Sequence, residues 1–199
     1  MSQLPTLPSS GRPVRLAQSC ASISLPLLTL LDSVLPKPPF LTLSIGSGPG
    51  LLEALFLHHY PSWSETLFGV EVPPTENNKP VNRFLKEQNM VIVGGTWAVV
   101  DEEMLEEKIG KETEVEEKKL CEKTEVKGLV FSYPRQTGLV KKYLDEMGGR
   151  LEVVVWVGPR CDEEGFGRVF GEWGFGEEVK GEEVVEEGEV VVVWRRKKA

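Results

Sequence analysis

Three glycines alternate with other residues in the segment Gly46-Ser47-Gly48-Pro49-Gly50. Glycine permits left-handed backbone conformations and lets a ligand approach the main chain closely, because it has no side chain. An apolar run over residues 41–45 precedes the segment, and a helical apolar pattern over residues 51–59 follows it. The N-terminus of a helix attracts negatively charged groups. The segment is therefore predicted to be a ligand-binding loop between a strand and a helix.

Glu71 is a second candidate, because it lies at the end of an expected strand over residues 66–72, 21 residues after Gly50. In open α/β sheets, ligands bind outside the carboxyl ends of the strands. A carboxylate at this place can accept hydrogen bonds from both hydroxyls of a ribose. The alternative is a solvated acid at a strand end.

Polar and aromatic residues follow two further expected strands. Thr96 and Trp97 come after residues 90–93, where a threonine can hydrogen-bond a ligand and a tryptophan can stack on one. The alternative for Trp97 is a place in the core. Tyr133 and Arg135 end and follow residues 128–133, and we expect Tyr133 to orient a substrate and Arg135 to hold an anionic one. The alternative is that the proline between them shapes a turn and Arg135 is a surface charge.

Apolar runs and helical patterns alternate along the chain, which favours a doubly wound, mostly parallel sheet with helices on both faces. The expected strands cover residues 41–45, 66–72, 90–93, 128–133 and 151–157, and the expected helices cover residues 51–59, 79–88, 138–147 and 162–173. Two more expected strands, residues 177–185 and 189–195, leave no room for a helix between them. They are predicted to form an antiparallel hairpin that turns near Glu187-Gly188.

The length of 199 residues suits one domain. Residues 1–40 are predicted to be an irregular and helical segment that packs on a domain formed by residues 41–199. Residues 101–126 hold 11 acidic and 5 basic residues and are predicted to be a charged insertion, helical at its start through Leu105 and Ile109. The alternative for this insertion is a lid or a partner-binding segment.

Composition excludes several classes of protein. The net charge of -8 does not favour a broad basic face for nucleic acid, and the run Arg195-Arg196-Lys197-Lys198 is expected to be a solvated tail. No apolar run is long enough for a membrane span, and the cysteines and the adjacent pair His58 and His59 lack metal-site spacing. A cytoplasmic protein without a metal is expected. The first 31 residues contain no acid, so a mitochondrial transit peptide is the alternative for the N-terminus.

The chain resembles the class I S-adenosylmethionine (SAM)-dependent methyltransferases over roughly residues 40–197, through LSIGSGPG at residues 43–50, FGVEV at residues 68–72 and the terminal hairpin. The resemblance implies a seven-stranded sheet with its last strand antiparallel. It also implies that the loop of residues 46–50 lines the methionine part of SAM, that Glu71 holds the ribose and that Thr96 and Trp97 lie near the adenine. The chain has Ser44 where the family has an acid, and Gly94-Gly95 where the family often has another.

The resulting hypothesis is a SAM-dependent methyltransferase that acts on a small molecule or a protein side chain. Tyr133 and Arg135 would position the acceptor, since positioning alone can supply much of the rate enhancement. The alternative is a methyltransferase-like protein without catalysis that serves as a binding or assembly subunit. An NAD-binding oxidoreductase is opposed by Leu51, where a dinucleotide fingerprint needs glycine or alanine. Little chain is left to cover the acceptor, so the site is expected to be either open or completed by a protein partner.

Overall fold

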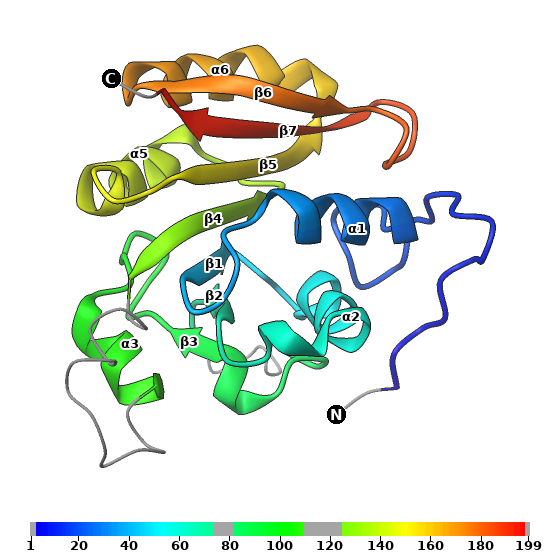
Figure 1. Cartoon of the computed structure of the whole chain (residues 1–199), viewed down its shortest axis with the longest axis horizontal. Coiled ribbons are helices and arrows are strands. Elements are labelled where there is room, and N and C mark those ends of the chain that lie inside the picture. Colours follow the sequence, from blue (N-terminus) through cyan, green and yellow to red (C-terminus); the bar gives the residue numbers. More distant parts are fainter. Residues whose placement is uncertain (1–2, 74–81, 110–124, 198–199) are drawn as a thin grey trace.

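The computed structural model describes residues 3–73, 82–109 and 125–197, which form a seven-stranded sheet in the order β3-β2-β1-β4-β5-β7-β6 (Figure 1). The strands are β1 (Leu41–Ile45), β2 (Leu67–Glu71), β3 (Met90–Ile92), β4 (Val126–Ser132), β5 (Val153–Pro159), β6 (Phe175–Gly181) and β7 (Glu189–Arg196). The strands β1 to β5 run parallel to one another, and β7 is antiparallel to both β5 and β6. The predicted doubly wound sheet with a terminal antiparallel pair is confirmed.

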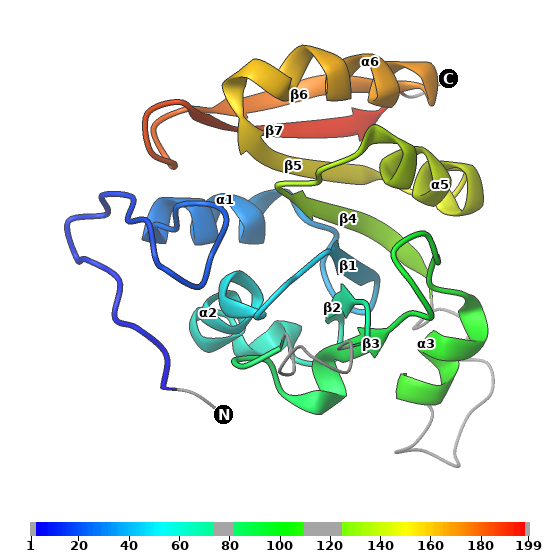
Figure 2. The same cartoon turned by 180° about the vertical axis from the view of Figure 1, so that it is seen from behind.

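Helices cover both faces of the sheet, as Figures 1 and 2 show from opposite sides. One face carries α1 (Leu25–Val34) and α2 (Leu51–His59), and the other carries α3 (Glu102–Ile109), α5 (Thr137–Met147) and α6 (Glu163–Glu172). Short 3-10 helices follow α2, precede β3 and precede α6. Of the 101–126 segment, α3 is described, whereas residues 110–124 lie outside the described residues. Within the described residues, we find no helix with the length and apolar character of a membrane span.

The central strands are buried on both sides because each of their faces meets a helix layer. In β1, Leu43 and Ile45 pack toward α3, α5 and α6, whereas Ser44 lies beside α2. In β5, Trp156 points to the layer of α3, α5 and α6, and Val155 points to the layer of α1 and α2. Both side chains are buried. This two-sided burial explains why β5 is an apolar run without alternation. In β1, Thr42 and Ser44 alternate with the apolar residues but are buried as well.

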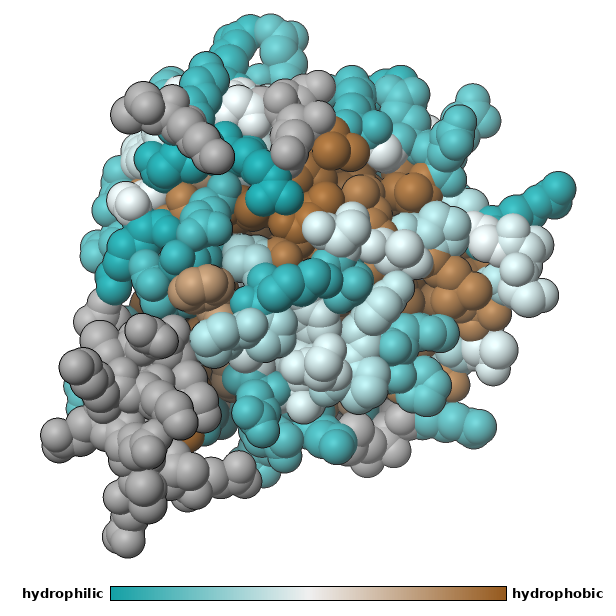
Figure 3. Space-filling model, in the orientation of Figure 1, coloured by the Kyte–Doolittle hydropathy of each residue, from teal (hydrophilic) through white to brown (hydrophobic). Residues whose placement is uncertain are grey.

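Residues 3–24 are irregular apart from a bridge between Val14 and Ile23, and they lead into α1. The Ser24 hydroxyl caps the helix by accepting a hydrogen bond from the Leu27 amide at 3.0 Å. Partly buried apolar side chains remain on the face of the sheet that carries α1 and α2. In Figure 3, apolar side chains gather in the upper half of the view, where α1 lies beside β5 and β7. The N-terminal segment thus packs on the same face of the sheet as α2.

The predicted helix over residues 79–88 is wrong in its described part. Residues 83–85 form bends, and the 3-10 turn Glu87–Asn89 follows, while residues 79–81 lie outside the described residues. The Asn82 side chain accepts hydrogen bonds from the amides of Phe84 and Leu85 at 3.3 and 3.0 Å. Asparagine side chains compete in this way with helical hydrogen bonds.

The predicted connection between the last two strands is also too short. The strand β6 ends at Gly181, so residues 182–188 connect it to β7 instead of a turn at residues 187–188. The N-terminal segment binds this connection, since the Ser24 hydroxyl donates to the Val184 carbonyl at 2.6 Å and the Glu186 amide donates to the Ser22 hydroxyl at 2.8 Å. These partners lie too far away in the sequence for a local pattern to show them.

The expectation of a solvated C-terminal tail is wrong for Arg195 and Arg196. Both belong to β7, and Arg196 donates to the carbonyls of Leu151 and Gly148 while its guanidinium lies 4.7 Å from the ring centre of Phe175. Arginine is suited to this role because its planar group can bond carbonyls and stack on a ring at once.

Phe131 offers a test of the core, because it is fully buried in β4 between the rings of Tyr143 and Phe170, 6.2 and 6.4 Å away between centroids. Phe131→Ala is expected to lower the free energy of unfolding by about 3–5 kcal/mol through lost burial and a cavity. Ile92→Ala, at a side chain 48% exposed, is the control and should change it by about 0.5 kcal/mol or less. Urea denaturation measures both, and equal effects would contradict this picture of the core.

Candidate functional site

The glycine-rich loop connects the end of β1 to the start of α2 at the centre of the sheet (Figure 1). Gly46, Gly48 and Gly50 all have positive φ, at 72°, 56° and 75°. A Cβ atom at Gly46 or Gly48 would meet no atom within 4 Å, whereas one at Gly50 would lie 2.8 Å from the Asn82 side-chain oxygen. Gly50 is therefore needed for packing, while Gly46 and Gly48 border open space.

Glu71 ends β2 and lies directly against this loop. One carboxylate oxygen accepts a hydrogen bond from the Gly48 amide at 2.7 Å, and the other accepts one from the Val72 amide at 2.9 Å. A carboxylate has room for further donors, since its two oxygens offer about four lone-pair positions. The structure thus brings together the acid and the loop that the sequence singled out.

The Ser47 side chain of this loop points into the protein. Its hydroxyl is buried without a hydrogen-bond partner among the described residues, and a Cβ at Gly69 of β2 would lie 2.8 Å from its oxygen. The side chain is therefore packed against β2, so any ligand contact of Ser47 would come from its main chain.

Thr96 and Trp97 lie in the loop between β3 and α3. Both are exposed, Trp97 by 46%, so the alternative that Trp97 is a core residue is wrong. The ring of Trp97 lies against Gly138 at the start of α5, and the Lys142 ammonium donates to the Trp97 carbonyl at 3.1 Å.

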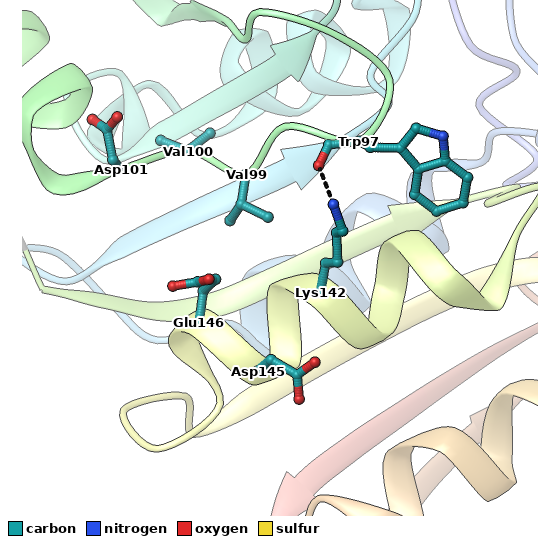
Figure 4. Close-up of a pocket in the computed structure, with 7 residues that line it drawn as sticks. All are labelled: Trp97, Val99, Val100, Asp101, Lys142, Asp145 and Glu146. Atoms are coloured by element: carbon teal, nitrogen blue, oxygen red, sulfur yellow. Dashed lines mark hydrogen bonds between the residues drawn. The ribbon is translucent and has the colours of Figure 1, made fainter.

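Trp97 also borders an open pocket of about 530 Å³ between this loop and α5 (Figure 4). Besides Trp97, the lining residues are Val99, Val100, Asp101, Lys142, Asp145 and Glu146. The pocket shares none of them with the glycine loop or with Glu71.

Tyr133 and Arg135 follow β4 at the same edge of the sheet. Arg135 is exposed. Tyr133 has a φ of 53°, which is uncommon for a residue with a side chain, and its hydroxyl donates to a carboxylate oxygen of Glu189 at 2.6 Å. Burial, followed by the hydrogen bond to Glu189, raises the pKa of Tyr133 above its ordinary value, so the phenol stays neutral.

Comparison with known proteins gives structural matches only, since no family model and no curated protein matches the chain. A precorrin-6y C5,15-methyltransferase from Geobacter metallireducens matches with a TM-score of 0.54 and 11% identity, covering 95% of this chain and 96% of that one. A precorrin-8w decarboxylase from Methanobacterium thermoautotrophicum matches with a TM-score of 0.54 and 9% identity, covering 96% and 99%. A magnesium protoporphyrin IX methyltransferase from Synechocystis PCC 6803, solved with bound SAM, has a TM-score of 0.44 and 11% identity over 86% and 77%.

The fold is that of the class I SAM-dependent methyltransferases. At this level of identity the likeness concerns the fold, and it does not fix a reaction.

Within this methyltransferase fold, Glu189 is a buried acid that sequence reasoning missed. It starts β7, is 2% exposed and accepts four hydrogen bonds. Tyr133 and Arg15 donate to one oxygen at 2.6 and 2.7 Å, and the amide and hydroxyl of Ser22 donate to the other at 3.0 and 2.6 Å. The only local signal was an acid at the head of the apolar run EVVVVW.

A second missed acid lies under the glycine loop. Glu53, at the third position of α2, is 3% exposed, and the Ser44 hydroxyl donates to one of its oxygens at 2.5 Å. The other oxygen has no hydrogen-bond partner among the described residues. Burial raises the pKa of Glu53 to about 7. The Ser44 hydroxyl of β1 thus binds a carboxylate that α2 supplies.

Glu53 makes stability depend on pH in an unusual direction. Between its ordinary pKa of 4.5 and its folded pKa of about 7, the folded protein keeps a proton that the unfolded chain releases. Raising the pH through this range should therefore destabilise the fold, by about 3 kcal/mol from this group, with no further loss above it. In Glu53→Gln this contribution should vanish.

Urea denaturation at several pH values between about 4.5 and 8.5 measures this dependence. Glu152→Gln, at an exposed carboxylate, is the control and should keep the wild-type profile. If Glu53→Gln also keeps that profile, Glu53 is not the group responsible.

Proposed function

We propose that the protein binds SAM at the carboxyl ends of β1 and β2 and transfers its methyl group to a small molecule or a protein side chain. The observation that carries this proposal is the contact between Glu71 and the Gly48 amide, beside open space at Gly46 and Gly48. An acid and a free main-chain loop are thereby available to one ligand at the edge where open α/β sheets bind ligands.

The residues present fit SAM. The main chain of residues 46–50 would hold its methionine part, and the remaining lone pairs of Glu71 would accept hydrogen bonds from its ribose hydroxyls. Thr96 and Trp97, exposed on the loop after the neighbouring strand, would meet the adenine. SAM supplies an electrophilic methyl group on a sulfonium. The protein's own residues therefore need to orient the acceptor and exclude water.

Tyr133 and Arg135 are the residues proposed to orient the acceptor. Tyr133 cannot serve as a base in its neutral form, so its contribution is a hydrogen bond. Arg135 is exposed and can pair with an anionic group of the acceptor. Catalysis would rest on positioning, which suits a reaction whose electrophile is already activated.

A non-catalytic binding or assembly subunit is the second candidate. It is favoured by Ser44, which binds a buried carboxylate at the place of the family's acid, and by the engagement of the Tyr133 hydroxyl with Glu189. In this function a protein partner would complete the open edge of the sheet. The two matches that span nearly the whole chain are named for different reactions, methylation and decarboxylation, so the fold does not choose between the candidates.

Calorimetric titration with SAM tests the cofactor site. Glu71→Ala is expected to weaken binding by about tenfold to a hundredfold, because it removes hydrogen bonds to a charged group. Gly48→Ala should weaken it by a similar factor, since the added methyl group would occupy the open space beside the loop.

Gly174→Ala is the matched control for Gly48→Ala. Gly174 also has a positive φ, of 80°, and a Cβ there would approach only Arg196 at 3.9 Å, at the start of β6. Both substitutions should cost about 1–2 kcal/mol of stability, but only Gly48→Ala should affect SAM. A folded wild-type protein that binds no SAM would refute the cofactor site and favour the non-catalytic subunit.

A further inference from the structure

The conformation of Tyr133 is the only positive φ at a residue other than glycine within the described part of the chain. Such a conformation costs on the order of 1–3 kcal/mol and persists only where the surroundings impose it. The Tyr133 amide donates to the Val157 carbonyl at 2.7 Å, and its hydroxyl is held by Glu189. The residue is thus fixed at both ends, directly after β4.

The hydrogen bond to Glu189 limits what Tyr133 can offer to another molecule. A tyrosine hydroxyl has one proton and two lone pairs. The carboxylate of Glu189 is an acceptor, so the proton of Tyr133 points to it, at an oxygen–oxygen distance of 2.6 Å. Tyr133 is half-buried, and its hydroxyl is left with its lone pairs, so it can only accept.

The other partners of Glu189 keep this arrangement in place. Arg15 and both donors of Ser22 saturate the carboxylate from the N-terminal segment. Removing Tyr133 from the group would leave three hydrogen bonds on Glu189, whereas removing Glu189 would leave all of its donors without this acceptor. The N-terminal segment therefore helps to orient a group at the end of β4.

We infer that Glu189 is a positioning residue of the acceptor site, which directs the Tyr133 proton away from the acceptor so that Tyr133 selects molecules bearing an O–H or N–H donor. The inference rests on the proposed function for its site and gives that function a class of acceptor. A phenol, an alcohol or an amine meets the requirement, and its methylated ether or tertiary amine does not. The same selection would favour release of the methylated product.

The test uses 3-fluorotyrosine-labelled full chain and ¹⁹F NMR, because the sequence holds three tyrosines and Tyr133→Phe identifies the Tyr133 signal. Phenol and aniline are titrated as donor probes, and anisole and N,N-dimethylaniline as their methylated counterparts, with S-adenosylhomocysteine present and absent. In the wild type, a donor probe should shift the Tyr133 signal with about tenfold higher affinity than its methylated counterpart.

Glu189→Ala should reduce this preference to about twofold or less, because the freed Tyr133 hydroxyl can then donate to an ether oxygen. Ser22→Ala removes a different donor to Glu189 and should keep the tenfold preference, even if it lowers stability. Should Glu189→Ala not fold, Tyr133→Phe keeps Glu189 and its other donors, and the donor preference, read from the probes' own line broadening, should still be lost.

Equal binding of both probe classes to the wild type, or no saturable shift from either donor, would overturn the inference. Loss of the preference in Ser22→Ala as well as Glu189→Ala would do the same, because Glu189 would then act only as an anchor for the N-terminal segment. SAM calorimetry on the same samples reports separately on the proposed function, since the proposed cofactor residues lie at the ends of β1 and β2 and after β3.

Discussion

The burial of β1 on both faces is the constraint on which the rest of the structure depends. Parallel neighbours β2 and β4 lie on either side of β1 and helix layers cover both of its faces, and the chain turns from its carboxyl end into α2 within five residues. The turn into α2 must then be made close to the ends of both neighbours, which requires the left-handed glycines of the loop. Because parallel strands end at one edge, the same constraint brings Glu71 and Tyr133 to that edge.

Three glutamates near this edge have identical side chains but different burial and different hydrogen-bond donors. Glu71 is half-buried and binds two amides of the main chain. Glu189 is buried but saturated by four donors, including an arginine. Glu53 is equally buried, but the Ser44 hydroxyl is the one side chain among the described residues that donates to it. Burial raises the pKa of Glu53 to about 7, because burial disfavours the charged form more than its hydrogen bonds favour it.

The sequence was sufficient for features that depend on local pattern. The strands were predicted within about two residues in most cases, because two-sided burial makes them apolar runs, and the loop and Glu71 were found because glycine and strand ends carry their own signals. The helix over residues 79–88 failed because one asparagine side chain replaced helical hydrogen bonds. Glu189 was missed because its partners lie 56 to 174 residues away along the chain, where no spacing rule applies.

The place of β7 has a consequence for the order of folding during synthesis. The strand latest in the sequence lies inside the sheet, between β5 and β6, so β5 has an unpaired edge until residues 189–196 have left the ribosome. Exposed strand edges invite pairing with other chains. Because Glu189 belongs to this strand, Arg15 and Ser22 are synthesised well before their carboxylate partner. A nascent chain therefore assembles the group of hydrogen bonds around Glu189 only after the glycine loop and Glu71 have been synthesised.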